Sequence, residues 1–262
     1  MIIDRLMTRR STVTGAAALA LMLGGVACGG GSASTPPPVT EQPGAVDAID
    51  PATAGSITGT VTFDGVPPLP TPIRMSSDPN CLPQTGAVTE AIVASGGHLA
   101  NVFVYVKDGL GGRRFPVPAT PVVLDQKGCR YTPHVVGIQA GQPMEIVNSD
   151  QTLHNVHGMG AMNSEFNTGQ PVPGMRLTHT FSTREVMVPF KCDVHGWMRA
   201  YVGVLDHPFY AVTAGDGRFT LTGLPPGTYT IDAWHETLGT KTQTVTIGAK
   251  EAKDVAFTYT ST

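Results

Sequence analysis

Four side chains in the second half of the chain have the types and the spacing of a metal site. The segment Cys192-x2-His195-x2-Met198 holds a thiol, an imidazole and a thioether within seven residues, and His154 lies upstream, after an apparent strand. Soft sulfur ligands favour Cu(I) and imidazole supports Cu(II), so this set suits an ion that changes between both states. These residues predict one copper ion per chain, used to carry single electrons.

The same residues also allow blander interpretations. Cys192 could form a disulfide with Cys81 or Cys129, which would leave the histidines as ordinary polar groups. Zinc could bind Cys and two His, but it gains little from a thioether and normally takes a stronger fourth ligand. His157 lies three residues after His154. On a strand, that odd spacing turns it to the opposite face, so we exclude it as a ligand.

The beginning of the chain has the features of an export signal. Arginines precede an apolar stretch, residues 13–26, which is too short for a comfortable membrane span and ends in Gly25-Val26-Ala27-Cys28. Residues 1–28 resemble a bacterial lipoprotein signal, in which Cys28 would be lipidated; cleavage after Ala27 without a lipid is the alternative. Residues 29–54, rich in Gly, Ser and Pro, are expected to form a flexible tether. We therefore expect an exported protein in the periplasm or on the cell surface, with a lipid anchor as its contact with the membrane.

Export to an oxidising compartment would allow the remaining cysteines to form a disulfide. If Cys28 is used at the signal, three cysteines remain, and an oxidising compartment allows two of them to pair. Cys81 and Cys129 both follow turn-like residues, which favours a disulfide between them. That pairing would leave Cys192 available for a metal.

The strands that position these ligands are predicted by short alternating apolar runs and regular turn signals. Charged residues make up 14% of the chain and the net charge is −3, which excludes a basic nucleic-acid-binding surface. Helical periodicity is almost lacking, and turns such as Asp64-Gly65 and Asp216-Gly217 separate the runs. The pattern predicts an all-β protein made of sandwiches or barrels. The expected strands are 57–63, 100–106, 135–139, 144–147, 185–190, 201–205, 219–221, 229–233, 242–247 and 255–259.

The ligand spacing, with His154-Asn155-Val156 upstream, resembles the cupredoxin family of blue-copper proteins over roughly residues 132–205. The resemblance implies a Greek-key β-sandwich in which Asn155 ties the two ligand segments together. It also implies that His195 is the electron port and that Trp197 belongs to a docking patch for a redox protein partner. The alternative for Trp197 is that it only packs the loop.

Residues 216–230 contain a Pro-Pro-Gly-x-Tyr turn and resemble the carboxypeptidase regulatory-like, or transthyretin-like, β-sandwich. We expect the cupredoxin domain at residues 76–207 and the regulatory-like sandwich at residues 208–262. The first strand of that sandwich resembles residues 55–75. The cupredoxin unit would then be inserted in the sandwich; two consecutive domains are the simpler alternative.

An electron carrier is expected rather than an enzyme, with no small-molecule substrate. Copper oxidases and reductases need a second copper site, often joined to the first through His-Cys-His, whereas Cys192 is flanked by Lys191 and Asp193. Two alternatives are a copper-buffering surface lipoprotein and a non-redox adhesive module.

Overall fold

The computed structural model describes residues 46–82 and 86–261. In these ranges the elements of secondary structure are all β-strands. The all-β prediction is therefore confirmed for this part of the chain. Among the described residues there is no helix long and apolar enough to cross a membrane. The expected signal with Cys28, and most of the expected tether, lie outside the described residues.

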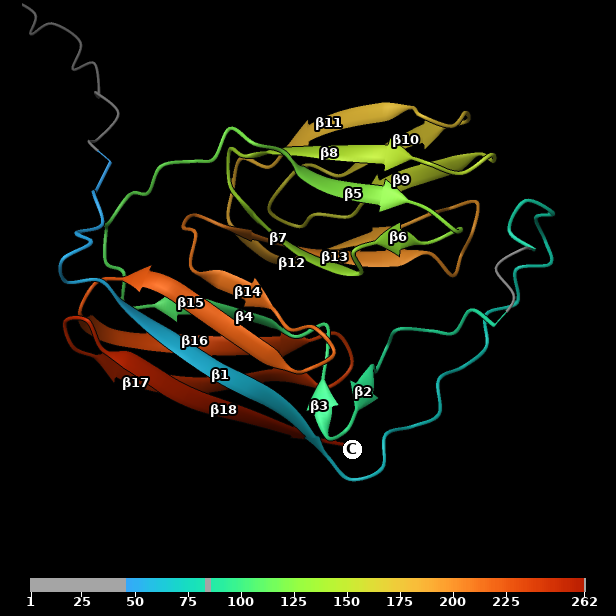
Figure 1. Ribbon diagram of the computed structural model, residues 1–262. Helices are drawn as coiled ribbons and strands as arrows, with labels where there is room; N and C mark the ends of the chain where they lie inside the picture. The colour runs from blue at the N-terminus through green and yellow to red at the C-terminus, as the bar shows by residue number, and fades with distance from the viewer. Residues whose placement is uncertain (1–45, 83–85, 262) are drawn as a thin grey trace, which may run out of the picture. The chain divides into compact units, whose positions relative to one another are not determined.

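Nine strands from the two ends of the described chain form one sandwich, which we call the split sandwich. One sheet has the order β15-β1-β3-β2, with β18 also on β1, and the other has the order β14-β4-β16-β17. In Figure 1 the blue strand β1 lies beside the red strand β18, with which it pairs in parallel. Its strands are β1 (Gly55–Asp64), β2 (Ala94–Ser95), β3 (His98–Leu99), β4 (Phe103–Asp108), β14 (Tyr210–Val212), β15 (Arg218–Leu224), β16 (Gly227–His235), β17 (Gly239–Ile247) and β18 (Ala252–Thr260).

The nine strands between β4 and β14 form a second sandwich, the inserted sandwich. Its sheets have the orders β10-β9-β12-β13-β7 and β11-β8-β5-β6. A separate apolar core fills it, with Leu124, Ile138 and Phe190 among its buried members. Its strands are β5 (Val122–Gln126), β6 (Tyr131–Thr132), β7 (Val135–Gln139), β8 (Pro143–Asn148), β9 (His154–Gly158), β10 (Phe166–Gln170), β11 (Arg176–Thr180), β12 (Glu185–Lys191) and β13 (Arg199–Leu205).

Strand pairing places the domain boundaries differently from the expected ones. β4 falls inside the expected domain 76–207, yet it pairs with β14 and β16 of the split sandwich. The short strands β2 and β3 likewise join the sheet of β1. The inserted sandwich therefore spans β5 to β13, and the chain leaves the split sandwich after β4 and returns to it at β14.

Sequence alternation explains how β1 builds its layer. Ile57, Val61 and Phe63 point into the core, Gly59 is buried with them, and the threonines that alternate with these residues are half-buried. This is the two-residue period of a sheet with one covered face. After β1 the chain turns at Gly65, whose φ of +100° suits glycine. The Pro-Pro-Gly-x-Tyr turn is closed by Tyr229, whose hydroxyl donates to the Pro225 carbonyl at 2.6 Å.

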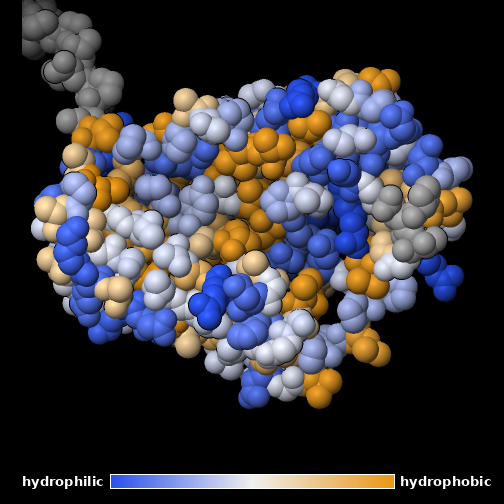
Figure 2. Space-filling view, in the orientation of Figure 1, coloured by the Kyte–Doolittle hydropathy of each residue, from blue (hydrophilic) through white to orange (hydrophobic). Residues whose placement is uncertain are grey.

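Both sandwiches lie within one compact unit of the chain, and a small apolar cluster joins them. Phe103 of β4 packs there with Val135 and Leu205 of the inserted sandwich. Gly137 and Gly203 are neighbours in the pairing of β7 with β13. A Cβ atom on Gly203 would lie 2.5 Å from the Phe103 ring, so the close approach requires glycine. In Figure 2, hydrophobic residues gather near the middle of the face shown, with hydrophilic residues around them.

Candidate metal centre

Three of the four expected metal ligands meet at one end of the inserted sandwich. His154 is the first residue of β9, and Cys192 and His195 lie in the loop between β12 and β13. One ligand atom from each of these residues lies within 4.8 Å of the others, and all three side chains are buried. The group thus brings two imidazole nitrogens and one sulfur together.

The distances show which imidazole atoms face the centre. The two Nδ1 atoms of His154 and His195 are 3.0 Å apart, and Cys192 Sγ lies 3.9 Å from His195 Nδ1. Both Nε2 atoms point away from the centre and contact carboxylates: His154 Nε2 lies 2.9 Å from Asp150, and His195 Nε2 lies 3.1 Å from Asp78. Both Nδ1 atoms are therefore directed toward the sulfur.

Backbone hydrogen bonds fold the ligand loop back on itself. The Cys192 N–H donates to the Met198 carbonyl at 3.2 Å, and the Met198 N–H donates to the His195 carbonyl at 2.9 Å. The His195 N–H points at Cys192 Sγ, 3.3 Å away. Met198 is 1% exposed and belongs to the same buried cluster as Cys192. The fourth expected ligand is thus held in the same closed loop as the sulfur.

Asn155 and Tyr131 connect the two segments that carry the ligands. Asn155 Oδ1 accepts the Asp193 N–H at 2.6 Å, beside Cys192, and its Nδ2 donates to the Asn167 side chain at 2.6 Å. The Tyr131 hydroxyl bridges the carbonyls of Asn155 and Lys191, at 2.6 and 2.9 Å. Asn155 thus has the contacts that the cupredoxin resemblance implies, whereas sequence reasoning missed Tyr131.

The charges around the centre favour a thiolate beside cationic or metal-bound imidazole. Burial lowers the pKa of His154, but hydrogen bonds to Asp150 and Cys192 outweigh burial and raise that pKa to about 9. Burial raises the pKa of the Cys192 thiol, and hydrogen bonds from His154 and from backbone N–H groups bring it below its usual value. The pKa of His195 is lowered, first by burial, even though Asp78 acts in the opposite direction. A metal cation would take the place of the His154 proton beside the sulfur.

Two carboxylates complete the centre, and sequence reasoning missed both. Asp150 accepts the N–H groups of Gly128 and Cys129 at 2.8 and 2.7 Å, in addition to contacting His154. A hydrogen bond from Thr152 is the first cause that lowers the pKa of Asp78 to about 2. Asp150 stands four residues before His154, a spacing that could have indicated it. Asp78 is 117 residues from His195, so no local pattern could have indicated it.

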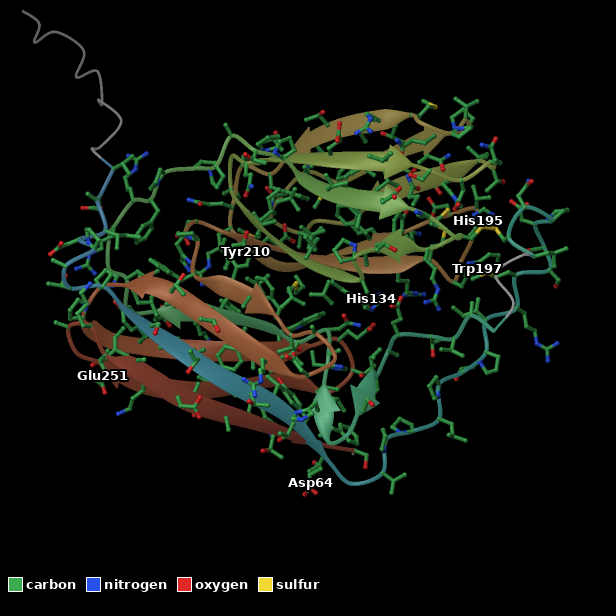
Figure 3. The ribbon with its side chains drawn as sticks, in the orientation of Figure 1. Asp64, His134, His195, Trp197, Tyr210 and Glu251 are labelled. Atoms are coloured by element: carbon green, nitrogen blue, oxygen red, sulfur yellow. A yellow bond between two sulfur atoms is a disulfide. The ribbon has the colours of Figure 1, made fainter. Side chains whose placement is uncertain are left out.

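Two of the three described cysteines form the expected disulfide, and the third keeps a free thiol. Cys81 and Cys129 are bonded to each other, with their Cα atoms 5.7 Å apart, and Cys192 is free and buried. This connection fastens residues 75–82 over the ligand loop, and Cys81 Sγ lies 3.9 Å from His195 Nε2. Figure 3 shows His195 and Trp197 near this disulfide.

The cupredoxin resemblance implies that His195 is the electron port, and such a role would be served by an exposed ring edge, which this cover does not leave. The residue is only 2% exposed, because Asp78 and the disulfide occupy the space beyond Nε2. Trp197 is half-buried and donates its Nε1–H to the Cys129 carbonyl at 3.0 Å. It packs against the disulfide cluster, in agreement with the packing interpretation, and its docking role stays a prediction.

Two other histidines near the centre have different partners. His157, excluded by its spacing, lies 2.9 Å from Asp193 and 2.6 Å from Glu165. His134 lies 2.5 Å from Glu236 and lines a cavity of about 340 Å³ that also touches Met198 and Trp197. Neither belongs to the cluster of His154, Cys192 and His195.

Residues 198–260 match the family model described as carboxypeptidase regulatory-like domain. The match covers β13 to β18, so it supports the expected regulatory-like sandwich but spans less than half of the chain. No curated protein matches the sequence.

Three solved structures are similar to parts of the chain. A copper-containing nitrite reductase from Thermus scotoductus has 22% identity and a TM-score of 0.32, covering 37% of this chain and 25% of its own. A point mutant of amicyanin in its reduced state has 22% identity and a TM-score of 0.30, covering 34% of this chain and 85% of its own. A purple cupredoxin from Nitrosopumilus maritimus has 20% identity and a TM-score of 0.28, covering 32% of this chain and 98% of its own.

These likenesses are weak and partial. The chain spans only a quarter of the length of the nitrite reductase.

Proposed function

We propose that the protein binds one copper ion through His154, Cys192, His195 and Met198 and carries single electrons. The observation that supports this most is the buried meeting of two imidazoles with one free thiol. Two nitrogens and one thiolate, with a weak thioether, are the donor set of blue-copper sites. The copper supplies reversible one-electron oxidation and reduction. The protein orients the donors, excludes water and holds the cysteine as a thiolate.

In this proposal the protein is a carrier rather than an enzyme. Cys192 is flanked by Lys191 and Asp193, whereas a His-Cys-His sequence often joins the two copper sites of copper oxidases and reductases. The partner in this proposal is a redox protein. The place is outside the cytoplasm, with Cys28 carrying a lipid anchor, which the export-like start of the chain supports.

The test is copper loading of the purified chain without residues 1–28. Cu(II) should bind with one ion per chain and produce an intense visible thiolate-to-copper band. Cys192→Ser should abolish the band while the circular dichroism of the sheets stays unchanged. His157→Gln is the matched control, because His157 is near the centre but points to Asp193 and Glu165, and it should keep the band.

The outcomes separate the alternatives. A colourless protein that binds Zn(II) more tightly than copper would replace the proposal with a zinc site. More than one copper ion per chain would favour an enzyme or a copper buffer. Failure to bind any metal, with the fold intact, would leave an adhesive module.

A further inference from the structure

The two histidines of the centre are held by a matched pair of carboxylates. Asp150 lies 2.9 Å from His154 Nε2, and Asp78 lies 3.1 Å from His195 Nε2. In both rings this leaves Nδ1 directed toward the partner histidine and Cys192. The two contacts are thus equivalent in geometry, although they come from separate parts of the chain.

Asp78 is placed by a tight turn and by a hydrogen bond from the neighbouring loop. Its Oδ1 accepts the Asn80 N–H at 2.8 Å, and its carbonyl accepts the Cys81 N–H at 3.0 Å. Thr152 donates its hydroxyl to Oδ2 at 2.5 Å, the same oxygen that contacts His195. The carboxylate therefore has a fixed position before any metal binds.

Asp150 is placed through the other half of the disulfide. It accepts the backbone N–H groups of Gly128 and Cys129, and Cys129 is bonded to Cys81. The disulfide thus joins the turn that carries Asp78 to the backbone that holds Asp150. One covalent bond fixes both carboxylates relative to the two rings.

We propose that Asp78 and Asp150 are positioning residues that hold both imidazoles with Nδ1 toward the metal and strengthen them as donors to Cu(II). A carboxylate on the far nitrogen fixes the tautomer of a metal-binding imidazole and raises its basicity. The effect is larger for Cu(II) than for Cu(I), because the doubly charged ion gains more from a stronger donor. The pair thus lowers the reduction potential and closes the His195 edge to water. This inference rests on the proposed copper function.

The orientation can be tested first in the metal-free protein. In the wild type, nitrogen NMR of His195 should show a protonated Nε2 whose proton exchanges slowly with water. In Asp78→Ala that proton should exchange at least about tenfold faster, because its acceptor and its cover are both removed. An unprotonated or freely exchanging Nε2 in the wild type would overturn the positioning role, whether or not copper binds.

The effect on the metal is tested with the isosteric variant Asp78→Asn. Its Cu(II) affinity should fall about 10- to 100-fold, the usual effect of removing such a partner. Cu(I) affinity should fall less, and each tenfold difference raises the one-electron potential by about 59 mV. Asp64→Asn is the charge control, because it removes one negative charge at the exposed last residue of β1.

Two failures are distinguishable. If Asp78→Asn and Asp64→Asn bind copper with the same affinity and potential as the wild type, the carboxylate inference is wrong and the proposed function stands. If the wild type binds no copper, the proposed function is wrong, and the exchange of the His195 proton still decides whether Asp78 orients the ring.

Discussion

Single hydrogen bonds decide how firmly the ligand residues are held. The ligand loop and β9 share no long ladder of strand pairing at His154, so side chains must join them. Asn155 and Tyr131 do this from one side, and the two carboxylates do it from the other. A rigid centre of this kind would change little between two oxidation states, which suits an electron carrier.

We predict that Asn155→Ala destabilises the metal-free protein by about 1–3 kcal/mol, because it leaves the Asp193 N–H without its 2.6 Å acceptor in a partly buried position. Urea unfolding followed by circular dichroism measures the change. Asn167→Ala serves as the control, since Asn167 is exposed, and it should cost clearly less. Equal stability of Asn155→Ala and wild type would show that this contact does not hold the loop.

Two buried histidines outside the centre should make stability depend on pH. Burial lowers the pKa values of His207 and His235 to about 4. In neutral His207, Nε2 donates to the Val106 carbonyl at 2.9 Å and Nδ1 accepts the Phe209 N–H at 3.2 Å. A proton on Nδ1 would remove this acceptor and repel the Phe209 N–H. Each histidine therefore contributes stability that is complete above about pH 6.5 and is lost as the pH falls toward 4, because only the unfolded chain binds the proton.

The variant His207→Gln isolates one of these contributions. Between about pH 6 and 4.5, its free energy of unfolding should fall less steeply than that of the wild type, by up to about 1.4 kcal/mol per pH unit. Urea titrations at several pH values measure both slopes. Parallel slopes would mean that His207 binds its proton equally in both states.

A glycine in β13 allows the two sandwiches to pack closely against each other. Gly203 lies in β13, the strand that begins at Arg199 directly after the ligand loop. A Cβ atom on Gly203 would lie against the Phe103 ring of β4. We predict that Gly203→Ala destabilises the protein by about 1–3 kcal/mol, because the new methyl group would need space 2.5 Å from that ring.

Gly169→Ala is the matched control in another strand, β10. The nearest atom to its new Cβ would be Leu153 Cδ1 at 4.0 Å, so the methyl group has room. Thermal unfolding of both variants measures the difference. A Gly203→Ala variant as stable as Gly169→Ala would show that the packing of Phe103 on β13 is loose.

The sequence predicted the strands with strong alternation and missed those without it. Each expected run overlaps a strand, and the run at 135–139 coincides with β7. β10 and β11 were missed because Phe166–Gln170 and Arg176–Thr180 are mostly polar and lie partly exposed. β4 was recognised as a strand, but its partner sheet depends on contacts with β14 and β16, more than a hundred residues away.

The ligand cluster itself could be predicted because Cys192, His195 and Met198 are close in sequence and their chemistry is specific. The cover over His195 could not, since it depends on Asp78 being brought to the ring by the fold. A local motif predicts which atoms bind a metal, and the fold of the whole chain decides which of their edges meet water.

The molecule as a whole should depend strongly on the Cys81–Cys129 bond, which closes a loop with a sequence separation of 48. We predict that the double variant Cys81→Ser, Cys129→Ser loses about 2–4 kcal/mol of stability, because its unfolded chain is no longer constrained. Thermal unfolding measures the loss. Treating the wild type with a reductant in denaturant and refolding it reduced is the control, and it should give the same value. A loss below about 0.5 kcal/mol would contradict the prediction.

The same bond changes how the two sandwiches can move. The backbone joins them twice, through residues 109–121 and 206–209, and two connections alone allow a swinging motion about the line between them. Cys81 follows β1 of the split sandwich and is bonded to Cys129, in the hairpin between β5 and β6, which adds a third connection. The bond therefore ties the loop between β1 and β2 to the end of the inserted sandwich that carries the ligand cluster. Reducing it would leave two covalent connections between the sandwiches and would release that loop from the cluster, so a reducing environment should uncover His195 before it unfolds either sandwich.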